Sequence, residues 1–200
     1  MRSIGFWVVN LLLGLSIMTG CGEINIIDPQ TADEQLVEDL EIIEEYRQSE
    51  GLTFVEDTLT YPVQYLILDE GDGKAINYED IVFCNYNLKL TTGELFHTSM
   101  DTVAIANEIY DEDLSYRPAI FTHTQTGWGV TPILGQPTGT TSTSYESGWK
   151  IGLTAALKKM NVGGRALIVS PSNYAYQSFN PFGIPDYSVV VYEVFVINAK

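Results

Sequence analysis

The pattern of hydrophobic and polar residues changes its period near residue 59. Upstream, Leu36, Leu40 and Ile43 recur at helical spacing, and the preceding run Thr31-Ala32-Asp33-Glu34 has the form of a capping box. Together these features predict a helix over residues 32–48. From residue 59 onward the period becomes two, which is typical of β-strands that bury one face.

The alternation is clearest over residues 81–90 and predicts a strand with two chemically different faces. One face carries Val82, Cys84, Tyr86, Leu88 and Leu90, and the other carries Asn85, Asn87 and Lys89. Further strands are predicted near 63–68, 94–96, 165–170 and 187–198, and residues 153–160 have a helical pattern. Since strands and helices do not alternate regularly, we predict an α+β fold with an antiparallel sheet and one central helix.

Residues 100–147 do not fit this pattern. They contain the acidic run at 111–113 and a stretch rich in Gly, Ser and Thr at 135–147. A loop of this length inside a domain is usually functional or mobile. We therefore predict a domain over residues 59–200 with a long insertion at about 100–147, preceded by an acidic helical segment at 31–58.

The first twenty residues have the features of an export signal. Arg2 is followed by an apolar run over residues 6–17, and Met18-Thr19-Gly20-Cys21 comes next. This ending resembles the bacterial lipobox, although Met18 stands where that pattern usually has Leu. We predict a lipoprotein signal peptide at 1–20, lipidation of Cys21 and a tether at 21–30.

A plain transmembrane anchor is the alternative, but the apolar run is short and lacks a basic flank on its far side. Gly22 follows the lipidated position, whereas Asp there is the usual signal for retention in an inner membrane. The predicted location is therefore the outer membrane, with the protein facing the periplasm or the cell surface.

Composition narrows the classes of partner and site. The chain carries 26 acidic and 10 basic residues, a net charge of −16, which repels nucleic acid. With Cys21 lipidated, Cys84 has no thiol partner, and its place in an apolar run predicts a small buried hydrophobe. His97 and His123 are the only histidines, too few for a zinc site, so no metal and no cofactor is expected.

Three segments, in order and with suitable spacing, carry a family resemblance. They are DIVFCNYNLKLTTGELFHTS at 80–99, GLTAALKKMNVGGRA at 152–166, and SPSNYAY at 170–176 continued by GIP at 183–185 and VYEV at 191–194. Over roughly residues 60–199 the chain resembles the FKBP-type peptidyl-prolyl cis-trans isomerases, and the acidic helix in front is similar to that of lipoprotein members. The resemblance implies an antiparallel sheet half-wrapped around one helix, with a shallow aromatic pocket between them.

The implied reaction is the isomerisation of X-Pro bonds in exported client polypeptides, against a barrier of about 18–20 kcal/mol. It needs no nucleophile, metal or cofactor. The pocket holds the proline ring against aromatic walls and favours the twisted amide, which is less polar than the planar one.

The resemblance also assigns pocket positions. The matching residues are Tyr86, Phe96, Tyr176, Ile184 and Tyr192. His97 stands where the family has an Asp near the substrate carbonyl, and a neutral His can form hydrogen bonds but supplies no negative charge. Gln177 and Asp186 replace a Gly and a Pro of the family pattern.

Two registers are open for the residue at the pocket floor. Counting back from Met160 without a gap puts Leu153 there, and Trp149-Lys150 then supplies the backbone N–H that binds ligand. Alternatively, Gly148-Trp149 matches the family's Gly-Trp directly, with one extra helical turn. We prefer the ungapped register.

Two functions follow from these observations. The first is a prolyl isomerase, of reduced activity if the altered pocket matters. The second is a non-catalytic FKBP-like binding or chaperone module on the membrane surface. The features that distinguish them are His97 and the floor residue.

Overall fold

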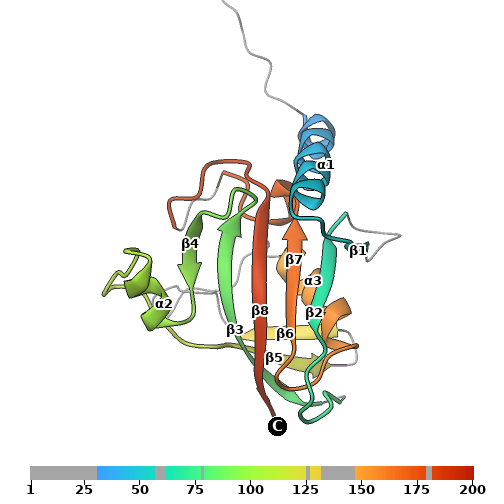
Figure 1. Cartoon of the computed structure of the whole chain (residues 1–200), viewed down its shortest axis with the longest axis vertical. Coiled ribbons are helices and arrows are strands. Elements are labelled where there is room, and N and C mark those ends of the chain that lie inside the picture. Colours follow the sequence, from blue (N-terminus) through green and yellow to red (C-terminus); the bar gives the residue numbers. More distant parts are fainter. Residues whose placement is uncertain (1–30, 57–61, 78, 125–126, 132–146, 179–181) are drawn as a thin grey trace, which may run out of the picture.

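The computed structural model describes residues 31–56, 62–77, 79–124, 127–131, 147–178 and 182–200. Their main element is a twisted antiparallel sheet (Figure 1). Its strands lie in the order β1-β2-β7-β8-β3-β5-β6, and β4 pairs with β3 beside β5. The bounds are β1 Val55–Glu56, β2 Gln64–Asp69, β3 Ile81–Leu90, β4 Leu95–Thr98, β5 Ala119–Thr124, β6 Gly127–Thr131, β7 Arg165–Ser170 and β8 Val190–Ala199.

The central strands follow the predicted alternation. β3 buries Val82, Cys84, Tyr86 and Leu88 almost completely, as its period of two predicts. The prediction that Cys84 is a small buried residue is therefore confirmed. β8 pairs with β3 on one side and with β7 on the other, so the concave face of these strands forms the main core.

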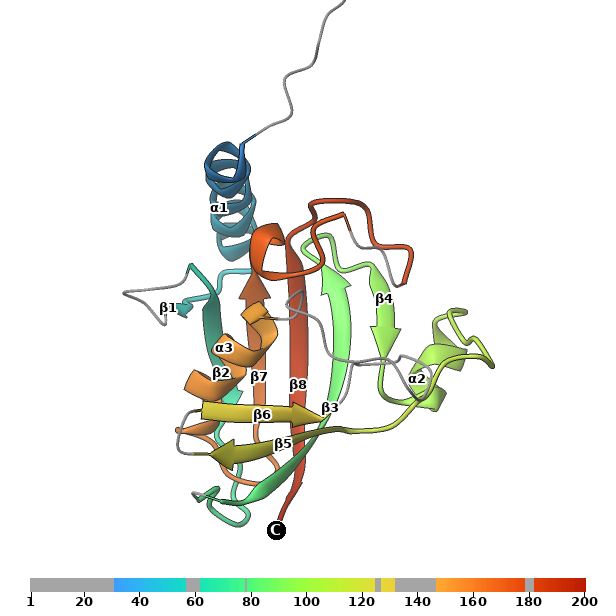
Figure 2. The same ribbon diagram turned by 180° about the vertical axis from the view of Figure 1, so that it is seen from behind.

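Helix α3, Ser147–Leu157, lies across the concave face of the sheet, and Figure 2 shows it from that side. It begins six residues before the predicted helical stretch at 153–160 and ends at Leu157. A glycine at position 152 permits its close approach to the sheet. A Cβ added there would overlap Cγ2 of Ile168 on β7 and lie 3.2 Å from Cγ1 of Val63.

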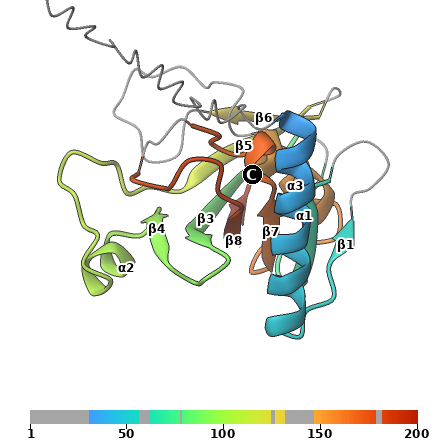
Figure 3. The same cartoon turned by 90° about the horizontal axis from the view of Figure 1, so that it is seen from above.

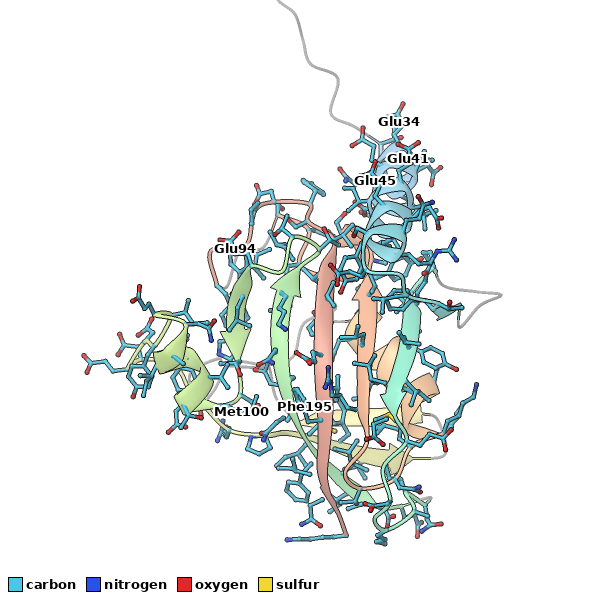
Figure 4. All side chains as sticks on the ribbon, viewed as in Figure 1. Glu34, Glu41, Glu45, Glu94, Met100 and Phe195 are labelled. Atoms are coloured by element: carbon cyan, nitrogen blue, oxygen red, sulfur yellow. The ribbon has the colours of Figure 1, made fainter. Side chains whose placement is uncertain are left out.

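Helix α1, Ala32–Ser49, confirms the predicted N-terminal helix and its cap. Thr31 Oγ1 accepts from the Glu34 amide at 3.3 Å, and the Glu34 carboxylate accepts from the Thr31 amide at 2.9 Å. The helix runs along the side of the domain (Figure 3). Its glutamates, among them Glu41 and Glu45, project away from the domain (Figure 4).

The inner face of α1 matches its hydrophobic spacing only in part. Ile43 is buried against Val169, Val189 and Val191, but Leu40 is 38% exposed. Asp39 is fully buried in its place. A hydrogen-bonded carboxylate therefore replaces one of the expected apolar contacts.

The predicted insertion at 100–147 contains regular structure that the alternation did not reveal. Helix α2 spans Asp101–Ala106, and β5 and β6 form an antiparallel pair that extends the sheet beyond β3. β5 is short, and of its side chains that the structure describes Ala119 and Phe121 are buried, so its period is weak in the sequence. Among the described helices, none is both long and apolar enough to cross a membrane. The predicted signal peptide and Cys21 lie outside the described residues.

Candidate prolyl-binding site

Tyr86 sits where the partner of β3 changes from β4 to β5. Its backbone amide donates to Ser99 Oγ at 2.9 Å. Its carbonyl accepts from Thr98 Oγ1 and from the Ser99 amide, each at 3.0 Å. The short hydroxyl side chains at the end of β4 and just after it thus replace the missing sheet partner and fix Tyr86 at the centre of the concave face.

Trp149 of α3 packs directly against this tyrosine. Its ring centroid lies 5.5 Å from that of Tyr86 and 4.8 Å from that of Tyr192 on β8. A third neighbour, Phe121 of β5, lies at 5.4 Å. All four rings are almost completely buried, so Trp149 joins strands β3, β5 and β8 through aromatic contacts.

These contacts bear on the two registers for the floor residue. Leu153 is also fully buried and belongs to the same core. Trp149, however, is the residue whose ring meets both Tyr86 and Tyr192. Both candidates for the floor residue therefore lie in the core of the concave face, and the choice between the two registers stays a prediction. Lys150 lies within α3.

His97 of β4 extends the aromatic group on the other side of Tyr86. Its Nδ1 lies 3.0 Å from the Tyr86 hydroxyl. The imidazole also stacks with Phe182 at 4.4 Å and with Tyr116 at 5.9 Å. Burial lowers the pKa of His97 to about 4, so the ring is neutral at pH 7.

The segment after β7 brings the remaining predicted residues to the same face. Tyr176 and Ile184 are buried in the main core. The ring of Phe182 lies 6.1 Å from that of Tyr176 at an interplanar angle of 88°. Phe96 is partly buried and packs against this core. We name the connected rings Tyr86, His97, Tyr116, Phe121, Trp149, Tyr176, Phe182 and Tyr192 the aromatic cluster.

Three members of the aromatic cluster were missed from the sequence. Tyr116 and Phe182 lie in irregular segments, where no periodicity marks a buried side chain. Phe121 lies on the unpredicted strand β5. The only available signal for Phe182 was its place immediately before the Gly-Ile-Pro run of the resemblance.

Helix α1 is joined by hydrogen bonds to the segment that carries Tyr176. The Asp39 carboxylate accepts from the Ser172 amide at 2.7 Å and from its hydroxyl at 2.6 Å. Asn173 Nδ2 donates to the Ala32 carbonyl at 2.8 Å. The backbone leading into the site is therefore held by the N-terminal helix.

Gln177 stands where the family pattern has glycine, and its backbone has a conformation that favours glycine. Its φ of 52° is in the left-handed region that favours glycine. Its side-chain amide donates to the Asn173 carbonyl at 3.1 Å, and its carbonyl accepts from the Tyr187 amide at 2.7 Å. These contacts offset the conformational cost.

A separate groove of about 680 Å³ lies between α1 and this segment. Its walls are formed by Ala32, Asp33, Gln35, Leu36, Asn173, Tyr174, Gln177 and Tyr187. It contains none of the residues predicted for the prolyl pocket. Within the described ranges, no three His, Cys, Asp or Glu residues are grouped closely enough to hold a metal ion.

Comparison with known families gives a match at the C-terminal end of the chain. Residues 136–197 match the model of the FKBP-type peptidyl-prolyl cis-trans isomerase family. This part of the chain is therefore similar to the FKBP-type peptidyl-prolyl isomerases. The matched range includes Trp149, Tyr176, Phe182 and Tyr192, so half of the aromatic cluster lies within the FKBP match. A search of curated protein sequences found no match.

Solved structures include several similar proteins. FkpA from Escherichia coli is 20% identical, with 84% of this chain and 62% of that chain covered and a TM-score of 0.48. A peptidyl-prolyl cis-trans isomerase from Pseudomonas syringae pv. tomato is 18% identical, with 85% and 96% covered and the same TM-score, 0.48. A multi-domain immunophilin from Arabidopsis thaliana is 19% identical, with 69% and 42% covered and a TM-score of 0.41.

The chain thus spans less than two thirds of the length of FkpA. The likeness to the FKBP family rests on the sequence match over residues 136–197. The strand order and the α3 helix on the concave face agree with the FKBP-like α+β fold predicted from the sequence.

Proposed function

We propose that this chain is a peptidyl-prolyl cis-trans isomerase and that the aromatic cluster receives the proline of its client. The observation that carries the proposal is the packing of Trp149 against Tyr86 and Tyr192. Trp149 and Tyr192 lie within the range that matches the FKBP family. Rings from β3, β4, β8 and α3 gather on the concave face and are almost completely buried, so a client reaches them by displacing a neighbour such as the partly buried Phe182.

The chemistry follows from the amide itself. The planar X-Pro amide is stabilised by resonance, and twisting it costs about 18–20 kcal/mol. The twisted amide is less polar, so an apolar aromatic site disfavours the planar form more than the twisted one. Stronger binding of the twisted form than of the ground state lowers the barrier.

Catalysed exchange between cis and trans forms of a short Xaa-Pro peptide, followed by NMR exchange spectroscopy, tests the function. We expect the wild-type chain to accelerate exchange and Trp149→Leu to lose at least about tenfold, because the floor of the site is removed. Phe195→Leu is the matched control, since Phe195 lies on the outer face of β8 (Figure 4). A wild-type rate equal to the uncatalysed rate would support the non-catalytic binding or chaperone module instead.

We further propose that the protein is held by a lipid at Cys21 and acts on exported clients at the outer membrane. The support is the sequence alone, namely the lipobox-like Met18-Thr19-Gly20-Cys21 after an apolar run. Stable anchoring needs more than one acyl chain. Cys21→Ser is expected to move the protein from the membrane fraction to the soluble fraction, and continued membrane retention of this variant would contradict the anchor.

A further inference from the structure

His97 has one ring nitrogen that the fold does not use. Its Nδ1 lies 3.0 Å from the Tyr86 hydroxyl. Its Nε2 has no hydrogen-bond partner among the described residues, although the residue is only 1% exposed. Few buried polar atoms are left unpaired in native structures, and each costs about 1–3 kcal/mol. An unpaired nitrogen in the candidate site therefore needs a functional explanation.

The contact with Tyr86 assigns the proton of the neutral ring. A phenol is a good donor and a weak acceptor, whereas an unprotonated imidazole nitrogen is a good acceptor. The favourable arrangement is thus an O–H of Tyr86 donating to Nδ1. The single ring proton is then on Nε2, which presents an N–H donor and no charge.

The neighbouring rings stack with the imidazole and do not accept a hydrogen bond from this N–H. Tyr116 and Phe182 stack with the imidazole at interplanar angles of 8° and 26°, so they cover its faces. The N–H lies in the ring plane and points past them. Because Nε2 is shielded from solvent, a client must displace a neighbour to reach it, and Phe182 is only partly buried.

The prolyl nitrogen, unlike the carbonyl oxygen, becomes a hydrogen-bond acceptor only during the reaction. In the planar amide the nitrogen lone pair is delocalised and accepts poorly. When the C–N bond twists, the lone pair localises on the nitrogen and becomes a hydrogen-bond acceptor. A donor placed there interacts with the transition state and not with the ground state.

We propose that Nε2–H of His97 donates a hydrogen bond to the prolyl nitrogen of the client as its amide twists. His97 is then a catalytic residue with a function that a carboxylate in its place cannot perform. This role rests on the isomerase activity proposed above.

Three variants separate the properties of the side chain. His97→Asp keeps an acceptor for Tyr86 and removes the donor, His97→Leu removes both, and His97→Gln can supply both. In the peptide exchange assay we expect kcat to fall at least about tenfold for Asp and Leu, with KM changed less than about threefold, and to fall less for Gln. An unchanged or higher kcat in His97→Asp would overturn the proposal, as would equal losses for Gln and Leu.

A second measurement does not depend on activity. The ¹⁵N resonances of the imidazole report which nitrogen carries the proton, and His123→Gln assigns the spectrum because the chain has two histidines. We expect the proton on Nε2 at pH 7, and a proton on Nδ1 would overturn the donor role even if the enzyme is active. A correct Nε2 proton together with no wild-type catalysis would instead refute the proposed function, and the catalytic role with it.

Discussion

The contact between α1 and the site segment leads to a quantitative prediction. Asp39 is fully buried and accepts three hydrogen bonds, at 2.7 and 2.6 Å from Ser172 and at 2.9 Å from Gln35. Hydrogen bonds to a charged group contribute about 1.5–3 kcal/mol each. Asp39→Ala removes the two hydrogen bonds to Ser172 and leaves the buried Ser172 amide unpaired. We therefore expect the free energy of unfolding to fall by about 3–5 kcal/mol.

Urea unfolding of the soluble Cys21→Ser chain measures this change, and Glu38→Ala is the matched control. Glu38 is the exposed neighbour of Asp39 on the same helix, and its replacement should change stability by less than about 0.5 kcal/mol. A double-mutant cycle with Ser172→Ala should give a coupling energy of about 1–3 kcal/mol. The reasoning is refuted if Asp39→Ala is no more destabilising than Glu38→Ala, or if the cycle shows no coupling.

Three further predictions concern the core. Burial lowers the pKa of His97 from 6.5 to about 4, so the contribution of His97 to stability is constant above pH 6.5. As the pH falls from 6.5 to 4, only the unfolded chain takes up the proton, and the free energy of unfolding should fall by about 3 kcal/mol. Urea unfolding of His97→Leu as a function of pH should lack this decrease. Burial raises the pKa of the Cys84 thiol. In the Cys21→Ser variant this thiol should therefore resist alkylation by iodoacetamide until the chain unfolds. Fast labelling of the native chain would contradict the burial of Cys84. Gly152→Ala should lower stability by about 1–3 kcal/mol because its Cβ overlaps Ile168, and unchanged thermal unfolding would argue against this close packing.

The parts of the fold that were predictable from the sequence are those with a strong local period. β3 alternates over ten residues, and α1 combines a helical spacing with a capping box, so both were predicted within about a residue of their observed bounds. Among the described side chains of β5, Ala119 and Phe121 are buried, and two residues do not define a period. The sheet extension was missed for that reason.

In the candidate site, too, residues on regular strands were predictable from the sequence and residues in irregular segments were not. Tyr86 and Tyr192 lie on regular strands, and their positions follow from alternation and family motif together. Phe182 is brought against His97 by the irregular segment after β7, and no local rule fixes such a course. Asp39 could not be predicted to be buried, because its partner Ser172 is 133 residues away in the sequence.

The most direct test of the proposed site is the position of a bound proline. Intermolecular NOEs can be measured between the proline ring protons of a labelled Xaa-Pro peptide and the aromatic protons of the protein. We predict NOEs to the rings of Tyr86 and Trp149, which pack together on the concave face. NOEs confined to the separate groove, at Leu36 and Tyr187, would show that the aromatic cluster is only a core and would contradict the proposed prolyl site.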